Sequence, residues 1–280
     1  MTVTAISKGQ QLWAAGKGID FDPRGYVPTI EQNLLRPLTG AAYAAYSTGD
    51  GGELNERGGR PAKMRALHSS SALTANVFDH WTNSQDATPL MLALDLPSRP
   101  TATQFEARFP TGVDSDANLD VYLPLTGSNV AGVECKFTEW LRGKTTRVGE
   151  AFRPPYLAPG RQRWSEVGLP RAQALALALQ EGREAFRHIG APQLLKHALA
   201  LARHHGDRWV LRYVYFDWPG PHGARHREEI ERFHQLVGEE LRFRAISYQT
   251  LFGHLRSAAR EEDAAYLSYL GERYFSAAPA

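Results

Sequence analysis

Three short segments in succession alternate apolar and polar residues, the period-two pattern that is typical of β-strands. They cover residues 103–110, 117–124 and 129–137. Because only short polar stretches separate them, we expect a meander of three neighbouring strands. The second and third segments carry charged residues in the middle of otherwise apolar sequence. A charge inside a sheet must be solvated, paired or bound to an ion, so this pattern strongly limits the fold.

The charged residues of the third segment are Glu134 and Lys136. Side chains alternate faces along a strand, so these two project together. The intervening and flanking apolar residues point the other way, into the core. They are Val133, Cys135 and Phe137.

The second segment contributes Asp120. The same alternation predicts one face formed by Leu119, Val121 and Leu123, and an opposite face formed by Asp120 with Tyr122. In a meander Asp120 can approach Glu134. Two neighbouring carboxylates in a partly buried site repel, and one takes up a proton unless a cation sits between them. Oxygen ligands of this kind suit Mg²⁺ or Mn²⁺.

The remaining sequence predicts helices on either side of these strands. Serines at 69–71 precede helical spacing up to residue 81. Further helices are expected at 169–187, 192–204, 226–237 and across most of 248–275, with strands at 207–218 and 241–248. The order is αβββαβ, which predicts an α/β (α+β) fold with a central mixed sheet flanked by helices.

Residues 1–65 are interrupted by Gly and Pro, so we expect little regular structure there beyond a helix around 31–46. This part is predicted to be an N-terminal extension packed on a core domain of residues 66–280, which ends in a C-terminal extension.

Composition places the chain among ordinary folded domains. It has 280 residues, of which 42% are hydrophobic and 22% charged. The first residues lack the basic-then-apolar layout of a signal peptide, and the apolar runs are too short to span a bilayer. The single cysteine, Cys135, cannot form an internal disulfide. These features predict a cytoplasmic protein with no membrane partner.

An aspartate, thirteen further residues and E-x-K on adjacent strands of an αβββαβ succession resemble the PD-(D/E)XK nuclease superfamily, which has the restriction-endonuclease-like fold. The resemblance covers about residues 69–218. Leu119 stands where that motif has proline. Segments such as "HSSSAL", "ECKFTE" and "QLLKH" are similar to those of bacterial members.

The resemblance implies roles for four residues. Asp120 and Glu134 would be metal ligands, helped by the backbone carbonyl of Cys135. Lys136 would orient or deprotonate the attacking water and stabilise charge on the phosphate. A divalent ion lowers the pKa of bound water and screens the phosphate, which makes a slow hydrolysis feasible.

Two further residues have alternative interpretations. Glu106, on the preceding strand and out of phase with its apolar neighbours, could supply another carboxylate or be a surface glutamate. Gln193 opens "QLLKH" and resembles the glutamine that some members place near the phosphate. An ordinary amphipathic helix is the alternative.

Basic residues cluster at 141–164, although the net charge of the chain is only +2. Phe152, Tyr156 and Trp164 are interleaved with them, a composition that suits a phosphate backbone and exposed bases. A solvated loop is the alternative. The basic residues are Arg142, Lys144, Arg147, Arg153, Arg161 and Arg163.

The leading hypothesis is a Mg²⁺- or Mn²⁺-dependent endonuclease acting on DNA. Its rivals are a catalytically inactive nucleic-acid-binding protein of the same fold and a globular protein in which Asp120, Glu134 and Lys136 form an ion-paired sheet face. The sequence leaves open whether RNA is the substrate and whether the chain forms a homodimer. His222 and His226 have the spacing of one helical face, but Pro221 and Gly223 favour an exposed basic segment.

Overall fold

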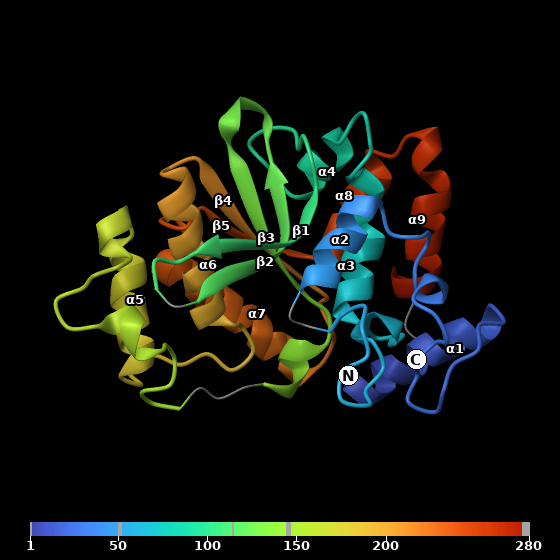
Figure 1. Ribbon diagram of the computed structural model, residues 1–280, viewed down its shortest axis with the longest axis horizontal. Coiled ribbons are helices and arrows are strands. Elements are labelled where there is room, and N and C mark those ends of the chain that lie inside the picture. Colours follow the sequence, from blue (N-terminus) through green and yellow to red (C-terminus); the bar gives the residue numbers. More distant parts are fainter. Residues whose placement is uncertain (1, 50–51, 114, 144–146, 276–280) are drawn as a thin grey trace.

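A five-stranded mixed sheet forms the centre of the computed structural model, which describes residues 2–49, 52–113, 115–143 and 147–275 (Figure 1). The strands lie in the order β1-β2-β3-β4-β5. The first three are antiparallel, and β4 and β5 continue the sheet in parallel. The predicted meander and mixed sheet are therefore confirmed. The strands are β1 (Gln104–Pro110), β2 (Asp116–Pro124), β3 (Val130–Lys136), β4 (Trp209–Tyr215) and β5 (Phe243–Ser247).

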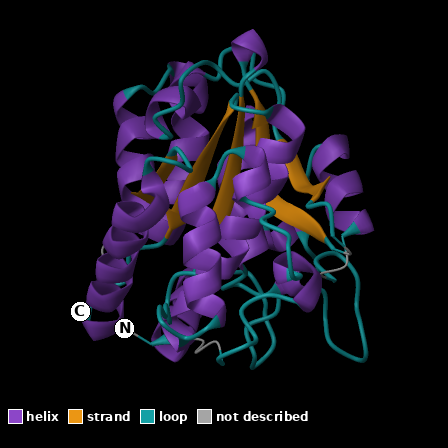
Figure 2. Cartoon of the chain, turned by 90° about the vertical axis from the view of Figure 1, so that its left-hand side faces the viewer, coloured by secondary structure: helices purple, strands orange, loops and turns teal. Residues whose placement is uncertain are grey.

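Helices cover both faces of the sheet, as Figures 1 and 2 show. One apolar cluster joins α1 (Val3–Gly16), α2 (Gly40–Thr48), α3 (Ser70–Phe78), α4 (Thr88–Ala93), α8 (Tyr248–Ser257) and α9 (Ala264–Leu270) to one face. A second cluster joins α5 (Pro170–Gln180), α6 (Ala191–His205) and α7 (Pro221–Phe233) to the other. Across the described residues, no helix combines the length and the apolar character needed to cross a membrane.

The helix predicted from Ser69 is present as α3 and a following 3-10 turn, Asp79–Trp81. The Ser69 hydroxyl accepts a hydrogen bond from the Ala72 N–H at 3.3 Å. This bond satisfies one of the N–H groups that a helix start leaves unpaired, which is why the serine run marks the boundary.

Some predicted boundaries are wrong. The helix expected around 31–46 is a 3-10 turn, Glu31–Asn33, followed by α2, because Pro37 interrupts the segment. The helix expected to reach residue 187 ends at Gln180, and Gly182 beyond it has a φ of +73°.

The helix α1 is absent from the sequence-based prediction, which expected residues 1–30 to be irregular. Its buried residues are Ile6, Gln10 and Ala14, spaced four apart. This narrow stripe contains a polar residue and a small one, so it gives only a weak helical signal.

Along the β1–β2 pair, the apolar side chains change from one face of the sheet to the other. Phe105 and Val121 are paired and pack in the cluster under α3, whereas the next pair, Ala107 and Leu119, packs under α6. The prediction that Leu119 and Val121 share a face is therefore wrong. Between these pairs stands Glu106, whose φ of +49° lies in a region that non-glycine residues seldom adopt. This local rotation of the backbone breaks the alternation.

Two helical glycines, Gly223 in α7 and Gly253 in α8, differ in how closely their surroundings pack. A Cβ at Gly223 would lie 1.9 Å from the backbone oxygen of Trp218, whereas a Cβ at Gly253 in α8 meets nothing within 4 Å. We expect Gly223→Ala to lower the free energy of unfolding by about 1–3 kcal/mol through overpacking. Gly253→Ala should raise it by about 0.5–1 kcal/mol, because alanine is the better helix former. Urea denaturation measures both, and equal stability of the two variants would contradict this packing.

Candidate active site

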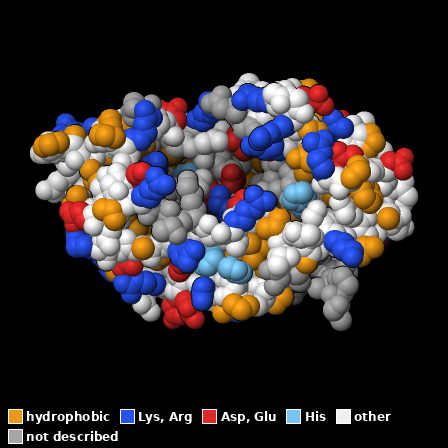
Figure 3. Space-filling model, turned by 90° about the horizontal axis from the view of Figure 1, so that it is seen from below, with side chains coloured by type: hydrophobic (Ala, Val, Ile, Leu, Met, Phe, Trp, Pro, Cys, Tyr) orange, Lys and Arg blue, Asp and Glu red, His pale blue; other side chains and the backbone are white. Residues whose placement is uncertain are grey.

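A cavity of about 480 Å³ lies between the centre of the sheet and the start of α3. Seen from below, the molecule is hollowed here, and acidic and basic side chains gather in the hollow (Figure 3). The sheet contributes Glu106, Asp120, Cys135 and Lys136, and the segment before and within α3 contributes serines and Thr74. Charged residues on the rim include Glu53, Lys63, Glu139 and Arg142. We call this the acidic cavity.

Glu134 is buried behind this cavity, with an exposed fraction of 1%. The Lys136 ammonium pairs with its Oε1, and the His197 Nε2 lies 2.9 Å from its Oε2. Burial raises the pKa of Glu134, but the charge of Lys136 and the His197 hydrogen bond outweigh burial and lower it to about 2. Glu134 is therefore ionised at all physiological pH values.

His197 comes from the middle of α6 and is itself buried. Because a carboxylate only accepts, the hydrogen bond assigns a proton to Nε2, while Nδ1 has no partner among the described residues. Sequence reasoning gave His197 no role. The signal available was its position one helical turn after Gln193. Gln193 lies beside Gly190 at the start of α6. It is not among the described residues that line the acidic cavity.

Asp120 enters the acidic cavity from β2. Its Oδ2 accepts a hydrogen bond from the Cys135 N–H at 2.7 Å. The pairing of Val121 with Val133 places Asp120 opposite Glu134 along the two strands. Burial and the charge of Glu134 raise the pKa of Asp120 well above its usual value, although Lys136 opposes the shift. Asp120 is thus a half-buried acid that a nearby cation would stabilise as a carboxylate.

Lys136 connects the two acids. Its ammonium pairs with Glu134 and lines the acidic cavity beside Asp120, whereas Glu134 is not among the described residues that line it. Burial lowers the pKa of Lys136, but the charges of Glu134 and Asp120 outweigh burial and raise it above its usual value.

Glu106 also lines the acidic cavity and is half-buried. The Asn118 Nδ2 donates to its Oε2 at 2.5 Å. Burial raises the pKa of Glu106, as do the charges of Glu53 and Glu134, although the Asn118 bond opposes them. Glu106 also has a positive φ, and backbone strain of this kind is found at functional sites.

Glu53 is a carboxylate that sequence reasoning missed. Its Oε2 accepts a hydrogen bond from the Ser71 hydroxyl at 2.5 Å, and its Oε1 lies 3.2 Å from the Lys63 ammonium. No local signal could have found it, because its segment is rich in Gly and has no periodic pattern.

The donor atoms of the acidic cavity fit a hard divalent cation. Asp120 and Glu106 offer carboxylate oxygens, and burial together with neighbouring negative charge raises the pKa of both groups, so a bound cation would stabilise their ionised forms. Burial also raises the pKa of the Cys135 thiol, so this residue offers its backbone rather than a thiolate. In the described part of the chain, no three His, Cys, Asp or Glu side chains are already arranged to hold an ion.

A comparison with protein families identifies the family of the chain. A family model described as "Restriction Endonuclease associating with ARP" matches residues 32–275. The chain belongs to this restriction-endonuclease family. No curated protein and no solved structure matches it. The match covers every strand and the whole acidic cavity except Tyr26.

The predicted nucleic-acid-binding residues of this family member lie in different surroundings. Arg142 lines the acidic cavity. Arg161 pairs with Glu166 at 3.0 Å, Arg147 lies 3.8 Å from Glu150, and the charge of Arg153 helps to lower the pKa of Lys196 after burial. Arg163 donates to the carbonyl oxygens of Pro155 and Gly112. Lys144 lies outside the described residues.

The aromatic residues between these cations are buried. Phe152, Tyr156 and Trp164 have exposed fractions of 3% or less and pack under α5 and α6. The prediction that they face exposed bases is therefore wrong, because their apolar surface is used inside the protein.

The pair of histidines near Pro221 lies on a helix, contrary to expectation. His226 is fully buried in α7, with its Nε2 2.9 Å from the Tyr213 hydroxyl, so it is not part of an exposed basic segment. His222 is exposed at the start of the same helix.

Asp120 and Glu134 should affect stability in opposite directions. A raised pKa means that Asp120 contributes stability at pH values below its unfolded pKa, and that this contribution is lost as pH rises through its folded pKa. Asp120→Asn imitates the protonated acid and keeps an acceptor for the Cys135 N–H. We expect it to raise the free energy of unfolding by about 1–2 kcal/mol near neutral pH.

Glu134 has a lowered pKa, so its contribution is present above the unfolded pKa of about 4.5 and is lost as pH falls toward 2. Glu134→Gln should lower stability at neutral pH by about 3 kcal/mol, since it leaves the half-buried Lys136 without its main partner. Urea denaturation at neutral and acidic pH measures both effects, with Asp116→Asn at the exposed end of β2 as the control. Destabilisation by Asp120→Asn at neutral pH would contradict the assigned electrostatics.

Proposed function

We propose that this chain is a Mg²⁺- or Mn²⁺-dependent endonuclease that hydrolyses phosphodiester bonds in DNA at the acidic cavity. The observation that carries the proposal is the Lys136 ammonium, which pairs with the buried Glu134 and lines a cavity that also holds Asp120 and Glu106. An ordinary surface ion pair would not need two further acids with raised pKa values beside it. Membership of a restriction-endonuclease family supports the same activity.

Asp120 and Glu106 would hold the metal together with the backbone carbonyl of Cys135. Glu134, whose two oxygens contact Lys136 and His197, would hold the Lys136 ammonium beside the ion. When bound, the ion lowers the pKa of a water molecule and screens the charge of the phosphate. The chain's own residues prepare this site. The Cys135 N–H fixes one oxygen of Asp120, and the Asn118 amide fixes one oxygen of Glu106. Each carboxylate therefore keeps its second oxygen for other contacts.

Lys136 acts as a cation rather than as a base in this proposal. Its raised pKa keeps the ammonium protonated at neutral pH, so it cannot accept a proton from water. A fixed ammonium at the edge of the cavity can instead orient the water and stabilise the negative charge that develops on the phosphate. The sequence left open whether Lys136 orients or deprotonates the attacking water, and its raised pKa favours the orienting role.

His197 is a positioning residue for Glu134. Its Nε2 proton binds Oε2, which leaves Oε1 directed to Lys136. Since α6 packs against β2 and β3, this bond ties the orientation of Glu134 to the packing of a whole helix. His197 therefore fixes the Glu134 carboxylate, and this carboxylate in turn fixes the Lys136 ammonium.

Cleavage of supercoiled plasmid DNA tests the proposal. We expect the wild-type chain to nick or linearise plasmid with Mg²⁺ or Mn²⁺ and to be inactive in EDTA. Asp120→Asn and Lys136→Ala should each lower the cleavage rate by about 10²–10³-fold, which is what loss of one electrostatic group typically costs. Asp116→Asn, on the same strand but exposed, should keep the wild-type rate.

Two results would contradict the proposal. Full metal-dependent cleavage by Asp120→Asn would show that this residue is a spectator. Tight binding of DNA by the wild-type chain, with no cleavage in either metal, would identify the inactive nucleic-acid-binding protein as the correct alternative.

A further inference from the structure

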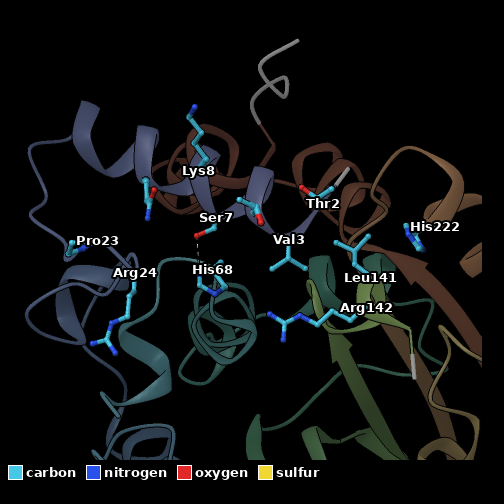
Figure 4. Close-up of a pocket in the computed structure, with 12 residues that line it drawn as sticks. Thr2, Val3, Ser7, Lys8, Pro23, Arg24, His68, Leu141, Arg142 and His222 are labelled. Carbon is cyan, nitrogen blue, oxygen red and sulfur yellow. Dashed lines mark hydrogen bonds between the residues drawn. The ribbon is translucent and has the colours of Figure 1, made fainter. Parts of the chain in front are cut away.

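A second cavity, of about 710 Å³, adjoins the acidic cavity. The two share His68 and Arg142, which form the wall between them. Figure 4 shows the second cavity under α1, with Val3 pointing into its centre and Arg142 extending beneath it toward His68. We call it the α1 cavity.

The helix that covers this cavity lies outside the residues matched by the family, 32–275. It is attached to the family core beside the shared wall, where the Ser7 hydroxyl lies 3.4 Å from the His68 Nδ1. This segment therefore adds a surface to the part of the chain that the family model matches.

The charges around the α1 cavity are positive. Lys8, Arg24 and Arg142 line it, and no Asp or Glu is among its described lining residues. Arg24 is paired with Asp22 at 3.1 Å, whereas Lys8 and Arg142 have no ion-pair partner within the described ranges. Lys8 is exposed, and in Figure 4 its amine extends away from Arg142. A cavity with this charge attracts anions and repels cations.

The lining also offers neutral groups of two kinds. Thr4 and Ser7, which carry hydroxyl groups, line the cavity from α1, and Val3 and Leu141 provide apolar surface. Burial and the charge of Arg142 lower the pKa of His68, so its imidazole is neutral at the shared wall. Cations, hydroxyl groups and a small apolar surface together match the phosphate, sugar and base of a nucleotide.

We propose that the α1 cavity binds the nucleotide next to the scissile phosphate in a DNA strand that runs from the acidic cavity past Arg142 and His68. This inference rests on the proposed nuclease function, because it assigns the substrate's path through the same site. Arg142 contacts the phosphate that joins the two nucleotides. Val3 and Leu141 pack against the sugar or base.

Thr4→Glu tests the inference because it places a carboxylate in the cavity from an exposed helix position. The affinity for a fluorescein-labelled DNA duplex is measured by anisotropy in EDTA, so that no metal or cleavage is required. We expect Thr4→Glu to weaken binding by about 3- to 10-fold at low salt. Lys8→Glu, the second variant, should weaken binding in the same direction. With Mg²⁺, both should raise KM for cleavage and leave kcat near the wild-type value.

Matched controls lie on or directly after the same helix. Leu12→Glu adds the same charge as Thr4→Glu at a residue that is 58% exposed. Lys17→Glu reverses the same charge as Lys8→Glu at the C-cap of the helix, where it also removes the ion pair with Glu272. Neither residue lines the described α1 cavity, and both controls should bind DNA as the wild type does.

The outcomes separate this inference from the proposed function. If the wild type cleaves DNA but Thr4→Glu and Lys8→Glu bind it as tightly as their controls do, the α1 cavity is not on the DNA path and the nuclease proposal stands. If the variants lose binding of free deoxynucleoside monophosphate but not of DNA, the cavity takes a free nucleotide and the inference is wrong. A wild-type chain that neither binds nor cleaves DNA would overturn the proposed function and this inference together.

Discussion

The ammonium of Lys136 lets this sheet carry acids in its interior. Glu134 is almost fully buried, and an isolated carboxylate there would cost several kcal/mol. Lys136 and His197 compensate that cost so completely that the pKa of Glu134 falls. The compensation does not extend to Asp120, whose pKa rises although Lys136 is nearby. The Lys136 ammonium is thus near two acids but neutralises mainly Glu134. Asp120, whose charge is not compensated, lines the cavity.

A local departure from regular strand geometry completes the site. The positive φ of Glu106 rotates the β1–β2 pair, so that Ala107 and Leu119 pack under α6 while Phe105 and Val121 pack under α3. Glu106 and Asp120 occupy the change of face and line one cavity. The backbone strain at Glu106 and the uncompensated charge of Asp120 both lower the stability of the fold. Both features at one cavity are expected where function has been selected over stability.

Much of this architecture could be predicted from the sequence, because alternation and helix caps are local signals. The three strands, the αβββαβ order and the helix after Ser69 follow from them, as does the placement of Asp120 opposite Glu134. The face of Leu119 could not be predicted, since a positive φ at a glutamate leaves no mark in the pattern. Glu53 reaches the site through tertiary packing of a glycine-rich segment, and α1 has a stripe too narrow to detect. His197 is the intermediate case, because its helix was predicted and its contact was not.

We propose that the unsatisfied acids of this cavity form a site for a divalent cation. Thermal unfolding of the metal-free chain during titration with Mn²⁺ or Mg²⁺ tests it without requiring any catalytic activity. A ligand that binds only the folded state stabilises it by about 2.7 kcal/mol at 100 times its Kd. We expect the melting temperature of the wild-type chain to rise with metal concentration, whereas the melting temperature of Asp120→Asn should start higher and should not rise. Equal metal-dependent shifts in both proteins, or no shift in the wild type, would contradict it.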